Sequence, residues 1–222
     1  FEVKPNSVFA IVGESGSGKS TIAKLMAGFF DADDGRIYFG DQDVKSIPTS
    51  QLMKHVAYVA QDNFLFDTSI RENLKIAKAD ATDEEIQAAL KAANCLELIE
   101  RLPEGLNSNA GDCGKFLSGG ERQRITLARA MLADAQCIIL DEATAYADVE
   151  NEAKIQEALS RLMKDKTLIV VAHRLNTIVG ADQIMVLGHG KIESIGTHKE
   201  LIQNSSAYQK LWQSYSGKEV VE

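Results

Sequence analysis

A glycine-rich segment near the start of the chain constrains the fold more than any other feature of the sequence. The apolar run from Ser7 to Val12 precedes it, and apolar residues at helical spacing follow it from Ser20 to Phe29. The segment matches the phosphate-loop pattern GxxxxGK(S/T) in full with the residues Gly13, Glu14, Ser15, Gly16, Ser17, Gly18, Lys19 and Ser20. A strand, this loop and a helix in that order predict an α/β domain that binds a nucleotide at the carboxyl end of the strand.

The loop carries the groups that bind a triphosphate. Its glycines let successive backbone N–H groups turn toward phosphate oxygens, Lys19 supplies a positive charge, and the Ser20 hydroxyl can ligate Mg²⁺. A Gly/Ser-rich turn with an ordinary surface lysine is the plainer interpretation, but the strand and helix on either side favour the phosphate loop. We therefore predict that ATP binds the loop together with the adjacent Thr21, and that Mg²⁺ is the cofactor.

A second phosphate-binding turn is predicted further along the chain, at Leu117–Glu121. Ser118 and Glu121 stand at capping-box spacing, so a helix is expected to begin there. Gly119 and Gly120 leave backbone N–H groups open to an anion at the positive end of that helix. Because one nucleotide cannot easily fill both turns of one chain, we expect the second turn to contact ATP held by another copy, at the interface of a dimer.

The other elements predict a mainly parallel sheet wrapped by helices. Strands are expected around residues 35–39, 55–60, 137–140, 167–172, 185 and 192, and helices alternate with strands from residue 137 onward. Between residues 62 and 129 the pattern is helical instead, with a capping box at Thr82 and Glu85. We predict one domain over residues 1–222, with the α/β core at 1–61 and 130–222 and an inserted helical subdomain at 62–129.

Polar residues follow three of the predicted strands, at the edge where the nucleotide is expected. Asp141 and Glu142 point to opposite faces of their strand, so Asp141 can face the Mg²⁺ shell and Glu142 the attacking water. The Gln61 amide can ligate Mg²⁺ or the water, and the His173 imidazole can hold the γ-phosphate and the water in line. Each residue also has a plainer interpretation. Asp141 and Glu142 could be only a solvated cap at the end of the strand, Gln61 a neutral loop residue, and His173 a histidine with a structural role. The predicted catalytic set is Lys19, Gln61, Glu142 and His173, and the predicted Mg²⁺ ligands are Ser20, Gln61 and Asp141.

Charge and hydrophobicity exclude other classes of protein. The 222 residues include 24 Lys and Arg against 32 Asp and Glu, and the formal net charge of −8 opposes electrostatic capture of nucleic acid. The longest apolar runs, such as Leu168–Ala172, are far shorter than the roughly 20 residues that span a bilayer. We therefore expect no nucleic-acid partner and no membrane-spanning segment within this sequence.

In their order along the chain, these motifs resemble the nucleotide-binding domain of an ATP-binding cassette (ABC) transporter. The matching segments are the Walker A loop at 13–20, the Q-loop at Gln61, the signature motif at 117–121, Walker B at 138–141 with the catalytic carboxylate Glu142, the D-loop at Asp148 and the switch histidine His173. The resemblance implies a P-loop NTPase core of the RecA-like kind that hydrolyses ATP. It also implies a head-to-tail dimer, homomeric or heteromeric, whose contacts to the other protomer's ATP are Ser118, Gly119, Gly120, Glu121 and Asp148.

Two segments, residues 61–73 and 108–112, are similar to exporter-type domains. Such domains are commonly fused to their own membrane-spanning segment, so the resemblance implies a transmembrane domain upstream and a position on the cytoplasmic side of the membrane. The sequence departs from exporters at Asn109 and Asp112, where glutamates are usual, and at Tyr146 and Ala147, where smaller and then aliphatic residues are usual. The family's adenine-stacking aromatic residue and first strand lie further upstream than this sequence reaches, so we expect a truncated N-terminal strand region.

Two other functions stay open beside the ATPase of an exporter. A cassette ATPase of DNA repair or chromosome organisation inserts long coiled coils between the glycine loop and the signature motif, whereas this sequence has a compact lobe without sustained heptads. A regulatory module binds ATP and hardly hydrolyses it, but the presence of Ser118, Glu142 and His173 opposes that interpretation for this chain. No segment of the sequence identifies a transported substrate.

Overall fold

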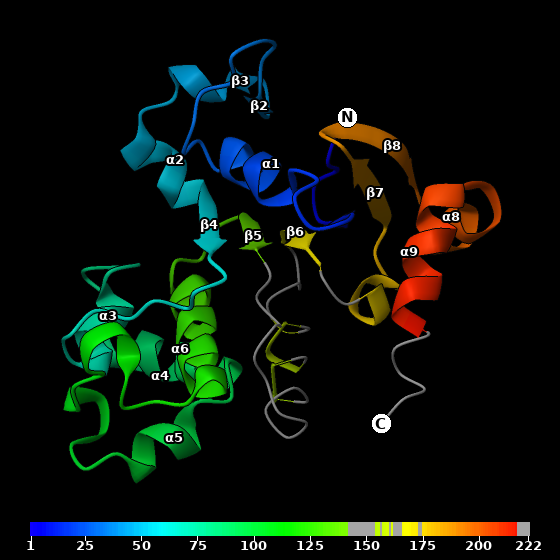
Figure 1. The fold of residues 1–222 in the computed structure, drawn as a ribbon. Helices are drawn as coiled ribbons and strands as arrows, with labels where there is room; N and C mark the ends of the chain where they lie inside the picture. The colour runs from blue at the N-terminus through cyan, green and yellow to red at the C-terminus, as the bar shows by residue number, and fades with distance from the viewer. Residues whose placement is uncertain (142–153, 156, 160, 162–165, 173–174, 217–222) are drawn as a thin grey trace.

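A six-stranded sheet forms the centre of the structure, a computed structural model that describes residues 1–141, 154–155, 157–159, 161, 166–172 and 175–216 (Figure 1). The strands are β1 (Val8–Val12), β2 (Tyr38–Phe39), β3 (Gln42–Asp43), β4 (Val56–Val59), β5 (Cys137–Asp141), β6 (Thr167–Val171), β7 (Gln183–Gly188) and β8 (Lys191–Gly196). The helices are α1 (Lys19–Met26), α2 (Thr49–His55), α3 (Ile70–Lys75), α4 (Asp83–Ala92), α5 (Leu96–Arg101), α6 (Gly119–Leu132), α8 (His198–Asn204) and α9 (Ser206–Ser216). Short 3-10 helices lie at Val44–Ser46, Gly105–Asn107, Asp112–Gly114 and Leu175–Ile178.

The central strands lie in the order β4-β5-β6-β1-β7-β8, with the first five parallel and β8 antiparallel to β7. The prediction of a mainly parallel sheet is therefore confirmed. The strand expected at 35–39 is shorter than predicted, because only its last two residues form β2, which pairs with β3 in a separate antiparallel sheet. Ile37 and Phe39 pack against the apolar cluster on the α1 side, whereas Arg36 and Tyr38 are exposed. The segment thus has one solvent-facing side, which an antiparallel pair tolerates and a strand buried on both faces does not.

Both faces of the central sheet are buried, as parallel strands require. The face that packs on α1 contributes to an apolar cluster that includes Phe9, Ile11, Ala23, Ala27, Ile139 and Ile169. The opposite face contributes Ile138 and Leu140 to a cluster with Ile125 and Ala128 of α6. Because side chains alternate along a strand, Asp141 projects from the α1 face, the same face as Ile139.

The helices α3, α4 and α5 gather around α6 to form a helical lobe beside β4 (Figure 1, green). The predicted capping box of Thr82 and Glu85 begins α4. The buried Asn73 ties α3 to α6, since its backbone and side-chain oxygens accept hydrogen bonds from Arg129, each at 2.9 Å. Helix α6 continues to Leu132, so the expected subdomain boundary at residue 129 falls inside a helix, and the division into subdomains stays a prediction.

Truncation of Ile139 should test the packing of β5 between β4 and β6. Ile139 is fully buried, and Ile139→Ala should lower the free energy of unfolding by about 2–5 kcal/mol, because the site loses apolar contacts and retains a cavity. Urea denaturation measures the change. Ile192→Ala is the matched control, since Ile192 on β8 is 44% exposed and its truncation should cost no more than about 0.5 kcal/mol. Equal losses in the two variants would contradict the assignment of β5 to the core.

Candidate nucleotide-binding site

The loop between β1 and α1 is a tight turn that excludes side chains at Gly13. Gly13 has a φ of +155°, and a Cβ atom placed there would lie 2.1 Å from the backbone oxygen of Leu187 on β7. Gly18 caps α1 in the left-handed region, with a φ of +101°. Glycine is the residue that adopts these conformations without a steric penalty. The loop therefore closes tightly over the end of the sheet and presents backbone rather than side chains.

Two polar side chains are buried within the loop. Lys19 is 5% exposed, and its Nζ atom donates hydrogen bonds to the backbone oxygens of Gly13 at 3.0 Å and Glu14 at 2.9 Å. Ser17 is 4% exposed, and its hydroxyl has no hydrogen-bond partner among the described residues. A buried donor without a partner is costly unless something else satisfies it. The unpartnered hydroxyl, the buried cation and the glycine turn together fit a polyphosphate.

Oxygen ligands for a metal meet directly below the loop. The Ser20 hydroxyl donates to Oδ1 of Asp141 at 2.9 Å, so the structure brings two of the three predicted Mg²⁺ ligands together. Hydroxyl and carboxylate oxygens are the ligands that Mg²⁺ prefers, and these residues fit that ion. The third predicted ligand, Gln61, is exposed after β4, and its backbone oxygen accepts a hydrogen bond from Asn63 at 3.1 Å. Among the described residues, no hydrogen bond joins the Gln61 amide to Ser20 or Asp141.

Tyr58 is a residue of this site that was not predicted from the sequence. Its hydroxyl donates to Oδ2 of Asp141 at 2.6 Å, so both carboxylate oxygens of a residue that is only 4% exposed are hydrogen-bonded. Burial raises the pKa of Tyr58, and the hydrogen bond and negative charge of Asp141 raise it further. The phenol therefore stays protonated and remains a hydrogen-bond donor.

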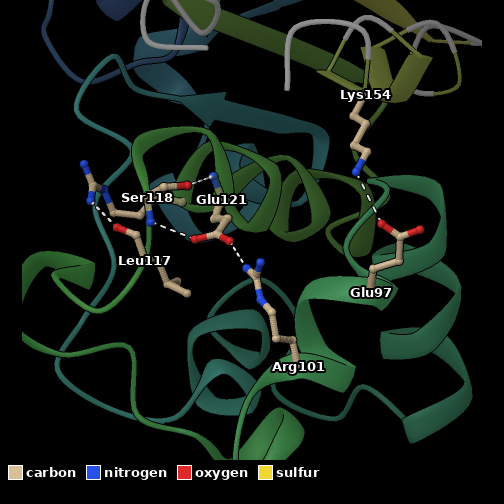
Figure 2. Close-up of polar contacts among 7 residues, drawn as sticks. Glu97, Arg101, Leu117, Ser118, Glu121 and Lys154 are labelled. Atoms are coloured by element: carbon tan, nitrogen blue, oxygen red, sulfur yellow. Dashed lines mark hydrogen bonds and ion pairs between the residues drawn. The ribbon is translucent and has the colours of Figure 1, made fainter. Parts of the chain in front are cut away.

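The signature turn has the geometry of a capped helix start, as predicted (Figure 2). The Ser118 oxygen accepts a hydrogen bond from the Glu121 backbone N–H at 3.3 Å, and the Glu121 carboxylate accepts one from the Ser118 N–H at 2.8 Å. Gly119 and Gly120 form the first turn of α6, and Ser118 lies exposed at its start. The Ser118 hydroxyl is therefore at the surface, on a helix end that attracts anions.

Arg101, at the end of α5, makes an ion pair with the other oxygen of the Glu121 carboxylate (Figure 2). Burial alone raises the pKa of Glu121, but the hydrogen bonds from Ser118 and Arg101 outweigh burial and lower it below its ordinary value. The capping carboxylate is thus held in its charged form by two segments of the helical lobe. No sequence motif indicated this role for Arg101, because it lies 20 residues before its partner.

The remaining predicted residues divide into two groups. Glu14, Ser15 and Gly16 are exposed at the tip of the loop, and Thr21 is exposed in the first turn of α1. Glu142, Asp148 and His173 lie outside the described residues. In the sequence, Glu142 directly follows β5, and His173 comes two residues after the end of β6. The roles assigned to all site residues stay predictions.

The order and spacing of these features agree with a family match along the sequence. The sequence model of the family described as ABC transporter matches residues 1–145, well over half of the chain. The chain belongs to the ABC transporter family. The matched residues include both the phosphate loop and the signature turn described above.

Relatives of this ABC domain share close to half of their aligned residues with it. It is 47% identical over 213 residues to the heavy metal tolerance protein of Schizosaccharomyces pombe, covering 96% of this chain and 26% of that protein. It is 46% identical over 212 residues to the ATP-dependent lipid A-core flippase of Xanthomonas oryzae pv. oryzae, covering 95% of this chain and 36% of that protein. It is 46% identical over 218 residues to the mycobactin import ATP-binding/permease protein IrtA of Mycobacterium tuberculosis, covering 98% of this chain and 25% of that protein. The chain thus spans 25% to 36% of the length of these relatives.

A solved structure shows the same fold. The structure of a bacterial Atm1-family ABC exporter with ATP bound superposes with a TM-score of 0.91 and 36% sequence identity, covering 100% of this chain and 38% of that one. The chain is an ABC ATPase domain of the type found in exporters, and the proteins named above give no support to the DNA-repair, chromosome or regulatory alternatives. Within the part of the chain that the structure describes, no helix has the length and apolarity to cross a membrane.

Loss of the loop lysine should remove most of the affinity for ATP. Lys19→Ala deletes the buried ammonium, and a charge-assisted contact of this kind is worth about 1.5–3 kcal/mol, or about 10- to 100-fold in affinity. Isothermal titration calorimetry with ATP and Mg²⁺ measures the loss. Lys24→Ala, on the same helix, is the control and should bind ATP like the wild type. Unchanged affinity in a folded Lys19→Ala protein would show that the loop is only a turn.

Neutralising the cap should make stability less dependent on pH. The pKa of Glu121 is lower in the folded chain than in the unfolded chain, so the charged cap stabilises the fold above about pH 4.3. That contribution is lost as the pH falls through the lowered pKa. Glu121→Gln should therefore cost about 1 kcal/mol at pH 7, and the difference from wild type should vanish in acid. Urea denaturation between pH 7 and pH 3 measures this, with the exposed Glu100→Gln on α5 as control. A difference that is independent of pH would argue against a charged cap.

Proposed function

We propose that this domain binds ATP in the phosphate loop and hydrolyses it to ADP and phosphate, and that the hydrolysis powers a transmembrane exporter. The observation that carries the proposal is the partly buried contact of Ser20 with Asp141 beside the loop. It joins a phosphate-binding element and a metal-binding carboxylate at one edge of the sheet, as phosphoryl transfer requires. The ATP-bound exporter with the same fold supports the nucleotide assignment.

In this mechanism the residues position charges rather than form covalent bonds with the substrate. Lys19 would bind the β- and γ-phosphate oxygens, and the predicted metal ligands would hold Mg²⁺, which would supply further positive charge there. Glu142 accepts a proton from the attacking water as the water oxygen bonds to the γ-phosphorus and the bond to the bridging oxygen of ADP breaks. His173 keeps the water and the γ-phosphate in line. The roles of Glu142 and His173 rest on the family resemblance, since both lie outside the described residues.

The second half of each site comes from another ATPase domain. Ser118 is exposed at the positive end of α6, and Gly120 lies buried in the first turn of the same helix. In the dimer, Ser118 and the N–H of Gly120 would approach the γ-phosphate held by a partner. A two-fold arrangement makes the loop of one protomer meet the signature turn of the other twice, so that two ATP molecules are buried together. Asp148 would join this interface. Because each site needs both protomers, the dimer is the catalytic unit.

A transmembrane domain would dock on the helical lobe, on the cytoplasmic side of the membrane. Phe64, Phe66 and Phe116 are 39%, 49% and 67% exposed, which is unusual for such large apolar side chains. Their two segments are adjacent, since the Ala110 N–H donates to the Thr68 oxygen at 2.9 Å. Phe64 and Phe66 lie within residues 61–73, and Phe116 follows residues 108–112, the two segments that resemble exporter-type domains. They follow Gln61 and precede the signature turn, so a partner bound there would contact the chain next to both predicted parts of the site.

The experiment that tests the proposal uses Glu142→Gln, which removes basicity but keeps the shape of the side chain. Phosphate release should fall about 10²–10⁴-fold while ATP binding survives. At high protein concentration with Mg·ATP, size-exclusion chromatography with light scattering should then show a dimer. Adding Ser118→Arg should restore the monomer, because an arginine fills the space of the partner's phosphate.

The control for the second step is Ser50→Arg, an exposed serine on α2, which should leave the dimer intact in the Glu142→Gln background. If the dimer forms equally well with Ser118→Arg, the signature turn is only a capped helix start. If Glu142→Gln hydrolyses ATP at the wild-type rate, the assignment of the catalytic carboxylate is wrong.

A further inference from the structure

Three elements converge on the Asp141 carboxylate. Ser20 at the start of α1 donates to Oδ1 at 2.9 Å, and Tyr58 on β4 donates to Oδ2 at 2.6 Å, while Asp141 itself ends β5. The two donors lie on opposite sides of the carboxylate group, one on each oxygen. The orientation of the carboxylate therefore depends on both hydroxyls, and not on the strand alone.

The register of the sheet explains how Tyr58 reaches this position. Tyr58 pairs with Ile139 in the parallel ladder of β4 and β5, and Asp141 follows Ile139 by two residues. Residues two apart on a strand share a face, so Tyr58, Ile139 and Asp141 all project toward α1. A phenol is long enough to span the two-residue step and place its hydroxyl at the carboxylate. A shorter hydroxyl side chain on β4 would not reach.

Phe29 holds the Tyr58 ring in place. The two rings meet edge to face, with centroids 4.9 Å apart and an interplanar angle of 62°. Phe29 follows α1, the helix that also carries Ser20, so the tyrosine is fixed against the same helix whose hydroxyl contacts the other carboxylate oxygen. Removing the phenol oxygen would leave the ring contact intact and would remove only the hydrogen bond to Asp141.

We propose that Tyr58 is a positioning residue for the metal site: its hydroxyl holds the Asp141 carboxylate toward Ser20 and thereby sets how strongly Mg²⁺ promotes ATP binding. The inference rests on the proposed function, because it takes Ser20 and Asp141 as the residues that hold Mg²⁺. Without the Tyr58 hydroxyl, a carboxylate oxygen in a residue that is 4% exposed loses its partner. The carboxylate then turns to find another donor, and its alignment with Ser20 is lost. Partners that orient metal-binding groups in this way typically contribute about 10- to 100-fold to metal affinity or activity.

The experiment compares ATP affinity with and without Mg²⁺ in the whole 222-residue chain. Isothermal titration calorimetry is carried out in EDTA and in saturating Mg²⁺ for wild type, Tyr58→Phe and the control Tyr38→Phe. Tyr38 lies on β2 and is 56% exposed. In Tyr58→Phe the gain in ATP affinity from Mg²⁺ should shrink by about tenfold, while the affinity in EDTA stays within about twofold of wild type. Tyr38→Phe should match the wild type in both buffers.

A double-mutant cycle shows whether Tyr58 acts through Asp141. In an Asp141→Asn background, Tyr58→Phe should cause no further loss of the Mg²⁺ effect, because the carboxylate that the phenol orients is already gone. A merely structural tyrosine would instead lower the melting temperature or weaken ATP binding equally in both buffers, and either result would overturn the inference.

The outcome also separates this inference from the proposed function. If wild type binds ATP more tightly with Mg²⁺ and Tyr58→Phe does so to the same extent, the proposed function stands and the role of Tyr58 is wrong. If wild type shows no Mg²⁺-dependent ATP binding, the proposed function fails, and the assignment of Tyr58 fails with it.

Discussion

The hydrogen bond between Ser20 and Asp141 is the contact on which the rest of the site depends, because it joins the first helix to a strand 121 residues later in the chain. It requires β5 to end at the level of the phosphate loop, and the parallel order β5-β6-β1 provides this. In such sheets the carboxyl ends of the strands meet at one edge, where ligands bind. The buried carboxylate in turn needs two donors, so Tyr58 on the neighbouring strand becomes part of the same arrangement.

Local patterns predicted the parts of the site that depend on short sequence separations. The phosphate loop, its flanking strand and helix, and the capping boxes at Thr82 and Ser118 all involve residues a few positions apart. The contact of Tyr58 with Asp141 spans 83 residues and depends on the pairing of β4 with β5, which no local pattern specifies. Arg101 was missed for a similar reason, since its partner Glu121 lies on another helix. Helix α6 also extends past the expected boundary, because its last turn still buries Leu132.

The charged cap of α6 links the geometry of the signature turn to the packing of the lobe. Glu121 accepts a hydrogen bond from the Ser118 N–H, which fixes the backbone next to the two glycines, and its second oxygen pairs with Arg101 of α5. The lobe is held to α6 at a second point by Arg129 and Asn73. Movement of α5 relative to α6 would therefore change the position of Ser118, and through it the surface offered to a phosphate.

Strand β5 packs against both the helix that follows the phosphate loop and the helix that begins at the signature turn. Ile139 and Asp141 project toward α1 and the loop, whereas Ile138 and Leu140 pack against α6, the helix that begins at the signature turn. The helices that follow the phosphate loop and the signature turn thus pack on opposite faces of one sheet. The alternation of side chains along β5 therefore directs Asp141 and the packing of α6 to opposite faces, and in the proposed head-to-tail dimer the signature turn would meet the phosphate loop of a partner rather than its own.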